Sequence, residues 1–407
     1  MGRQDSAVAD STFSILGLLA QGLSRFAYTV LIGRVLGASD LADVNFAFAV
    51  AILLSLVGPT AAGNAAAAFA GRTAHARALL RIVVGLIVAL SSAGAALGWL
   101  VVGTHAFAVQ CALLTAGWCG YIVGRGVFVG AGRVRAAASW DIITGVLALV
   151  LLLGVLAAGW VTWILLPAII GYGVFATAAA FTRLSSATSE ADRVEGGYGR
   201  FVLWNSLALI ATNGLMQMSM VVSSAFDTGD AAGQFAAALS LATPLSMVAQ
   251  GITQVMLPRF ASWRALDDLE HRKAARRAAG ALTGVLVAGG AVVALILPFA
   301  LPLVYGPAFR AAVGLAQGLM VAVVFFSLSV FFAAHLAATD RAHVSTLLAG
   351  IGFVAGAAVM GLLAVTVGGN VGAVVGASVG MIVSAVLLAA ASLCPRWREG
   401  ERTYASG

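Results

Sequence analysis

The residue with the greatest potential for specific chemistry is Arg25, an arginine within an otherwise apolar segment. It lies thirteen residues after Thr12, where a stretch long enough to cross a membrane begins, or about 20 Å along a helix. An arginine at the centre of such a helix costs ~2.5 to 3.5 kcal/mol, and intramembrane cations usually face an internal cavity. Because a guanidinium keeps its charge and forms paired hydrogen bonds with phosphate oxygens, Arg25 predicts a phosphate-binding site. Two alternatives stay open, in which the side chain extends to the outer membrane surface or pairs with Asp43.

Other polar side chains in the apolar segments also gather on single helix faces. At 100° per residue, they form one polar stripe on the first segment and another on the seventh. Further polar residues follow Pro59 in the second segment and Pro244 in the eighth, which predicts a central cleft lined by these four segments and two proline hinges. The candidate substrate-binding residues are Gln21, Arg25, Tyr28, Asn64, Asn205, Thr212, Gln250 and Gln254. The alternative for each is a hydrogen bond between packed helices.

The segments that must position these residues are membrane helices. The chain is 61% hydrophobic and 10% charged over 407 residues, which leaves too little polar surface for a water-soluble protein of this size. A membrane-spanning helix needs roughly 20 mostly apolar residues. Twelve such stretches are predicted, at 12–33, 43–70, 79–102, 107–129, 139–158, 161–182, 201–226, 233–257, 278–304, 311–338, 344–366 and 371–393.

Basic residues predict the orientation of these helices. All but three of the 23 Lys and Arg residues fall on one side of the predicted membrane, the exceptions being Arg25, Arg34 and Arg310. Because basic loops remain in the cytoplasm, both termini are predicted to be cytoplasmic, in an inner or plasma membrane protein without a cleaved signal peptide. The net charge of +7 then reflects anionic membrane lipids as partners, and nucleic-acid binding is not expected.

The two halves of the chain resemble each other. Residues 43–49 match residues 232–238, each after a short outer turn that contains Asp, and both following segments contain a proline and end in a basic stretch. We therefore predict an all-α protein with two six-helix lobes related by a pseudo-two-fold axis along the membrane normal. The predicted parts are an N-terminal lobe (1–183), a cytoplasmic linker (184–199), a C-terminal lobe (200–394) and a cytoplasmic tail (395–407). Glycines at every fourth position from Gly368 to Gly380 predict close helix packing.

Several chemistries are disfavoured by residues that the sequence lacks. Its one lysine, Lys273, does not belong to a phosphate-binding loop of the ATPase type, and no zinc-ligand motif or catalytic external loop is present. We expect neither an enzyme nor a metal site or cofactor. The acids closest to the membrane interior, Asp43 and Asp141, are placed near the ends of their segments. Without a carboxylate at the membrane midplane, proton antiport is disfavoured.

The end of the first segment and the start of the second resemble a known superfamily. The turn Arg34–Gly37 leads through residues 38–43 into Phe46–Ala49, and this stretch is similar to the multidrug/oligosaccharidyl-lipid/polysaccharide (MOP) exporters. The closest similarity is to flippases of polysaccharide precursors and of lipid II. This resemblance implies two six-helix lobes around a cleft, with Arg25 in the position of a cationic residue that binds pyrophosphate. The chain lacks the two additional C-terminal helices of lipid II flippases and the embedded acid of drug exporters.

The predicted function is a flippase that moves a polyprenyl-pyrophosphate-linked oligosaccharide across the plasma membrane by alternating access, for cell-envelope polysaccharide synthesis. Its expected partners are this lipid-linked glycan, membrane lipids and other membrane proteins of envelope synthesis. The first alternative is a cation-coupled multidrug antiporter. The second is a non-transporting membrane scaffold of an envelope-synthesis complex.

Overall fold

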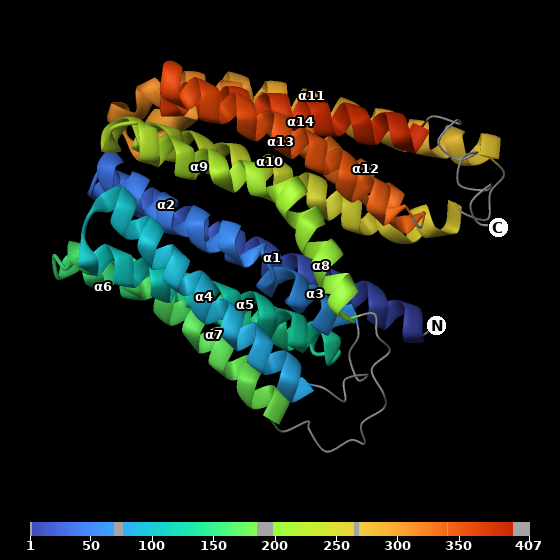
Figure 1. Ribbon diagram of the computed structural model, residues 1–407, viewed down its shortest axis with the longest axis horizontal. Helices are drawn as coiled ribbons and strands as arrows, with labels where there is room; N and C mark the ends of the chain where they lie inside the picture. Colours follow the sequence, from blue (N-terminus) through green and yellow to red (C-terminus); the bar gives the residue numbers. More distant parts are fainter. Residues whose placement is uncertain (1, 69–75, 185–197, 264–267, 340, 394–407) are drawn as a thin grey trace. The chain divides into compact units, whose positions relative to one another are not determined.

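The computed structural model describes the backbone of residues 2–68, 76–184, 198–263, 268–339 and 341–393, and its course can be followed from blue to red in Figure 1. Regular structure in these ranges is entirely helical. The helices of the first half are α1 (Gly2–Val35), α2 (Ala38–Ser55), α3 (Pro59–Ala68), α4 (Ala76–Val102), α5 (His105–Gly130), α6 (Val134–Ala157), the short 3₁₀ helix η1 (Val161–Trp163) and α7 (Leu166–Leu184). Those of the second half are α8 (Tyr198–Leu209), the π-helix η2 (Ile210–Gly214), α9 (Leu215–Phe226), α10 (Gly229–Ser262), α11 (Asp268–Tyr305), the 3₁₀ helix η4 (Pro307–Ala311), α12 (Ala312–Ala338), α13 (Ala342–Thr366) and α14 (Gly369–Leu393).

The described ranges contain eleven helical segments that are long and apolar enough to cross a membrane, which makes the chain a multi-pass membrane protein. They correspond to the second to twelfth predicted spans. The first predicted span, 12–33, lies inside α1, a 34-residue helix that is not one of these eleven. With α1, the helices fit the predicted layout of twelve spans in two lobes.

The chain folds into two compact units, each of which packs mainly within itself. Unit 1 comprises Met1–Ile210 and Thr228–Gly233, and unit 2 comprises Ala211–Asp227 and Gln234–Gly407. The seventh predicted span, 201–226, is therefore shared. Its first part, α8, belongs to unit 1 and contacts α3, whereas α9 belongs to unit 2 and contacts α13 and α14. The π-helix η2 separates the two parts, and π-helical turns inside longer helices are frequent at functional sites.

Helix α5 lies at the centre of unit 1, where α2, α3, α4 and α7 all pack against it. Small residues allow these contacts. A methyl group at Gly63 of α3 would lie 2.7 Å from the carbonyl oxygen of Ile122, and one at Gly126 of α5 would collide with the carbonyl oxygen of Gly63. Only residues without a side chain let these backbones approach so closely.

A buried polar side chain fixes the end of unit 1 at which η1 lies. Gln110 of α5 is 1% exposed, donates to the carbonyl oxygen of Thr162 at 2.8 Å and accepts from the amide of Leu165 at 3.2 Å. These bonds satisfy backbone groups of the irregular η1 segment that the helices leave unpaired. Such compensation is needed because an unpaired polar group is costly in a non-aqueous environment.

The turn between α1 and α2 explains the glycine in the Arg34–Gly37 motif. Gly37 has a φ of 104°, a conformation that residues with a side chain rarely adopt, and its amide donates to the carbonyl oxygen of Ile32. A glycine at this position reverses the chain within two residues. The motif thus has a structural role in joining the first two spans.

Unit 2 confirms the predicted glycine packing. A methyl group at Gly372 would lie 2.7 Å from the carbonyl oxygen of Met360, and one at Gly356 would lie 2.7 Å from that of Gly376. Helices α13 and α14 therefore pack backbone against backbone, and α14 also packs on α12 and α9.

The proline-containing spans of the two units have different geometry. Helix α2 ends at Ser55 and α3 starts at Pro59, so the second span is broken ahead of its proline. Helix α10, in contrast, continues through Pro244 from Gly229 to Ser262. A proline removes one backbone hydrogen bond and strains the preceding turn, but it does not always end a membrane helix.

The orientation predicted from the basic residues leads to a direct test. Ala131 and Ala158 are both exposed and directly follow α5 and α6, at opposite ends of α6. In a protein whose three cysteines are replaced by alanine, Ala158→Cys is expected to react with a membrane-impermeant maleimide added to intact cells. Ala131→Cys is expected to react only after permeabilisation, because its loop carries Arg133 and Arg135. Labelling of the 131 variant in intact cells would reverse the assigned orientation.

Candidate functional site

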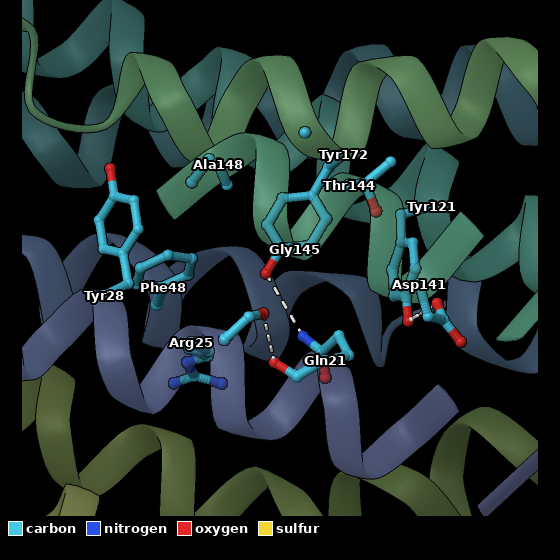
Figure 2. A pocket seen from close by; sticks show the side chains of 13 residues that line it. Gln21, Arg25, Tyr28, Phe48, Tyr121, Asp141, Thr144, Gly145, Ala148 and Tyr172 are labelled. Carbon is cyan, nitrogen blue, oxygen red and sulfur yellow. Dashed lines mark hydrogen bonds between the residues drawn. The ribbon is translucent and has the colours of Figure 1, made fainter. Parts of the chain in front are cut away.

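A pocket inside unit 1 brings together residues from α1, α2, α5, α6 and α7 (Figure 2). Its lining residues are Gln21, Ser24, Arg25, Tyr28, Phe48, Tyr121, Asp141, Thr144, Gly145, Ala148, Ala168, Gly171 and Tyr172. The cavity volume is about 20 Å³, enough for roughly one water molecule. In the described conformation the pocket therefore has room only for a molecule about the size of water.

Arg25 contributes a positive charge to this pocket. Its guanidinium carbon lies 5.0 Å from the centre of the Phe48 ring, a cation–π arrangement that stabilises the charge without neutralising it. Asp141 forms an ion pair with Arg125 and not with Arg25, and the predicted alternative of an Arg25–Asp43 pair is not formed among the described residues. Arg25 thus remains available for an anionic ligand.

Gln21 and Tyr28 lie on either side of Arg25 in the sequence of α1, and their side chains have different hydrogen-bond partners. The Gln21 amide donates to the Tyr172 hydroxyl at 3.4 Å and lies beside Arg25 in the pocket, as the dashed line in Figure 2 shows. Tyr28 is buried, and its hydroxyl donates to the carbonyl oxygen of Ile164, next to η1. Gln21 is placed to orient a ligand, whereas the Tyr28 hydroxyl is already engaged by the backbone.

Asp141 is the charged residue of this pocket that the sequence analysis did not include among its candidate site residues. It is the eighth residue of α6 and only 1% exposed, whereas the sequence analysis placed it near the start of the fifth predicted span. One carboxylate oxygen accepts from the Tyr121 hydroxyl at 2.9 Å and the other accepts from Nε of Arg125 at 3.2 Å. Arg125, which the sequence analysis counted with the cytoplasmic basic residues, is therefore an internal partner. The sequence did contain a signal for this pair, because Arg125 and Asp141 have opposite charges and each lies inside a predicted span.

Backbone packing fixes the position of Asp141. A methyl group at Gly17 of α1 would lie 2.6 Å from the Asp141 carboxylate, and one at Gly145 would lie 2.9 Å from the Ser24 hydroxyl. Helices α1 and α6 can pack this closely because both glycines lack side chains. Because α1 and α6 pack tightly, Arg25 of α1 and Asp141 of α6 line the same pocket.

Comparison with solved structures identifies the fold. The chain superposes on an inward-facing multidrug resistance MATE family transporter of the MOP superfamily with a TM-score of 0.67, at 16% identity over 97% of this chain and 100% of that one. It superposes on the lipid II flippase MurJ in an inward closed conformation with a TM-score of 0.68, at 11% identity over 93% of this chain and 86% of that one. This chain has the fold of the MOP superfamily.

A third MOP superfamily structure, from Pyrococcus furiosus, matches with a TM-score of 0.63, at 16% identity over 94% of each chain. Its description reports a binding pocket of reverse polarity that suggests a different function. No protein-family model and no curated protein matches the sequence. At these identities the structural similarity shows the fold alone, and the ligand must be argued from this chain's own residues.

Four other predicted site residues are not among those that line the pocket, namely Asn64, Asn205, Thr212 and Gln250. Asn64 of α3 donates to the side-chain oxygen of Asn205 of α8 at 2.9 Å, so these two amides bind each other within unit 1. Thr212 lies in the π-helix and accepts from the side chain of Asn213 at 2.9 Å. Gln250 is half-buried on α10, and the side chain of Gln254 lies outside the described residues.

Metal-binding groups are not a feature of the described part of the chain, where no cluster of three or more His, Cys, Asp or Glu residues occurs. The pocket itself contains charged side chains, one of which has a charged partner. Arg25 and Arg125 are cationic and Asp141 is anionic, so the group as a whole is positively charged. An arrangement of this kind favours an anion.

Proposed function

We propose that this protein is a flippase for a polyprenyl-pyrophosphate-linked oligosaccharide of the plasma membrane, acting in cell-envelope polysaccharide synthesis. The observation that carries the proposal is Arg25, which lines an intramembrane pocket and has no carboxylate partner among the described residues. A permanent charge in this location costs several kcal/mol, and an anionic ligand offsets that cost. Pyrophosphate suits a guanidinium because its oxygens accept paired hydrogen bonds.

The fold supports a transport role, because it is the fold of solved MATE transporters and of MurJ. The size of the pocket limits what binds there. A volume of about 20 Å³ excludes a sugar, so the glycan and the polyprenyl chain must lie outside it. We assign only the pyrophosphate to Arg25, and only in a state in which the pocket is wider, as an alternating-access cycle provides.

The test of this function is lipid translocation by purified protein. Proteoliposomes would carry a fluorescent polyprenyl-pyrophosphate oligosaccharide, and a membrane-impermeant reductant would quench the probe in the outer leaflet. Wild-type protein is expected to expose inner-leaflet probe to the reductant over time. Vesicles without protein, and vesicles with a fluorescent uncharged polyprenol, control for leakage and for general lipid scrambling. Quenching that stays at the outer-leaflet level in the presence of folded protein would refute the flippase proposal.

A second candidate, a cation-coupled multidrug antiporter, is favoured by one observation. Asp141 is a buried carboxylate inside a membrane span, the kind of residue that proton-coupled transporters use. Against this role, both of its oxygens already accept hydrogen bonds and its charge is paired with Arg125. Glycan export is therefore not expected to require protonation and release of a proton by Asp141.

The two candidates predict opposite results for removal of the acids. Asp141→Asn and Asp43→Asn are expected to leave glycan export largely intact, because neither carboxylate is assigned a proton-carrying role and loss of a negative charge does not oppose an anionic ligand. Efflux of a cationic dye along a proton gradient is expected to be absent in the wild type and in both variants. Proton-dependent dye efflux that either substitution abolishes would establish the antiporter instead.

A further inference from the structure

The pocket is lined by the acid Asp141 as well as by the cation Arg25, and the negative charge of the acid affects whether an anion can bind. Asp141 lines the same cavity as Arg25, yet the carboxylate is bound by Arg125 and Tyr121 and not by Arg25. In Figure 2, Arg25 and Asp141 lie on opposite sides of the hydrogen bond between Gln21 and Tyr172. The pocket lining therefore contains both a cation available to a ligand and an acid that is already neutralised.

An unneutralised acid at this place would oppose anion binding. The Asp141 side chain has no exposed surface, and that of Arg125 is 16% exposed, so water screens their charges weakly. In such an environment a unit charge acts on other charges several times more strongly than it does in water. A free Asp141 carboxylate would repel a pyrophosphate at Arg25 and would attract the Arg25 guanidinium toward itself.

Tight packing prevents Asp141 from leaving the pocket. The carboxylate lies against Gly17 of α1, where even one methyl group would come within 2.6 Å of it. Tyr121, which holds the other oxygen, is 2% exposed and packs on Phe175 with ring centres 4.7 Å apart. Because the acid cannot move away, its charge must be cancelled where it lies.

We propose that Arg125 determines the anion selectivity of the pocket by holding and neutralising Asp141, so that Arg25 stays free for the ligand. Arg125 is a positioning residue in this scheme, because it does not line the cavity itself. The inference rests on the proposed function, in which Arg25 binds a lipid pyrophosphate. It adds that specificity depends on a second arginine, which acts through Asp141.

The test uses full-length protein in lipid nanodiscs, with farnesyl pyrophosphate as the probe and farnesol as its uncharged control. Arg125→Gln is expected to weaken farnesyl pyrophosphate binding on the order of tenfold, the effect of one weakly screened charge. Arg125→Gln combined with Asp141→Asn is expected to restore wild-type affinity, because the two removed charges cancel. Arg125→Lys keeps the charge and is expected to bind close to wild type. Farnesol binding should be equal in all variants.

A purely structural role for Arg125 predicts a different pattern. The doubly substituted protein would then bind as weakly as Arg125→Gln, and that result would overturn the inference. If Arg125→Gln does not fold because it leaves a buried acid unpaired, Asp141→Asn and the double variant decide the matter. Asp141→Asn, which adds a net positive charge, is expected to bind more tightly than the double variant, and equal affinities would overturn the inference.

Failure of the inference is distinguishable from failure of the proposed function. If Arg25→Ala binds farnesyl pyrophosphate as well as the wild type, or if the wild type prefers farnesol, the proposed function is wrong, and the role of Arg125 is wrong with it. If Arg25→Ala loses binding while Arg125→Gln keeps it, the function stands and only the role assigned to Arg125 is refuted.

Discussion

Arg25→Ala is expected to abolish translocation of the lipid-linked oligosaccharide while leaving the amount of folded protein in the membrane unchanged. The substitution removes the pocket cation that lacks a carboxylate partner among the described residues, and its contact with Phe48 contributes only modestly to stability. Relief of the cost of burying a charge offsets the loss of that contact. Translocation normalised to folded protein, measured by quenching of the fluorescent probe in proteoliposomes, provides the test.

Two further variants test whether activity depends on the guanidinium geometry of Arg25 and on the location of its charge in the pocket. Arg25→Lys is expected to retain part of the activity, because the charge remains while the paired hydrogen bonds are lost. Arg34→Ala is the matched control, since Arg34 is exposed near the end of the same helix and lies outside the pocket. Arg34→Ala is expected to translocate normally. Full activity of Arg25→Ala would show that the membrane protein merely tolerates this charge.

The helical architecture was predictable because it depends on local properties of the sequence. Long apolar segments satisfy their backbone groups only as helices, so eleven of the twelve predicted spans match apolar helices of the described chain. The stripe on the first span was predictable for the same reason. Helical periodicity places Gln21, Arg25 and Tyr28 on one face, and the pocket indeed contains all three.

The pairing of charges at the pocket could not be predicted from the sequence, because it depends on which helices contact each other. Arg125 lies near the end of α5, where a sequence reading assigns basic residues to the cytoplasm, and its pairing with Asp141 becomes evident only when α5 and α6 pack together. For Asn64 and Asn205, the sequence analysis left both ligand binding and a hydrogen bond between packed helices open. The structure joins them to each other at 2.9 Å.

The breaks in the helices also depend on tertiary structure. A proline occurs in both the second and the eighth span, yet only the second span is divided into two helices within the described residues. The break in the seventh span, at the π-helix Ile210–Gly214, contains no proline at all. The division of the chain into two units falls at this π-helix, which no proline or charge pattern in the sequence marks.

Gly126→Ala is expected to destabilise unit 1 by about 1 to 3 kcal/mol or more, the cost of overpacking a tight contact. Its new methyl group would collide with the carbonyl oxygen of Gly63, and backbone atoms cannot move aside as a flexible side chain can. Helices α3 and α5 would have to separate, and α3 carries Asn64, the partner of Asn205 on α8. The melting temperature of the purified protein in detergent should fall, and the yield of monodisperse protein should fall with it.

Gly173→Ala is the matched control for this prediction. Gly173 lies on α7 of the same unit, and a methyl group there would meet nothing within 4 Å. The control variant is therefore expected to melt at the wild-type temperature or slightly above it, because alanine is the better helix former. Since Gly126 is not among the pocket residues, a milder form of its defect should lower the amount of folded protein without changing the activity of the folded fraction. Equal stability of Gly126→Ala and Gly173→Ala would contradict the backbone contact between α3 and α5, and with it the packing that places α5 at the centre of the unit.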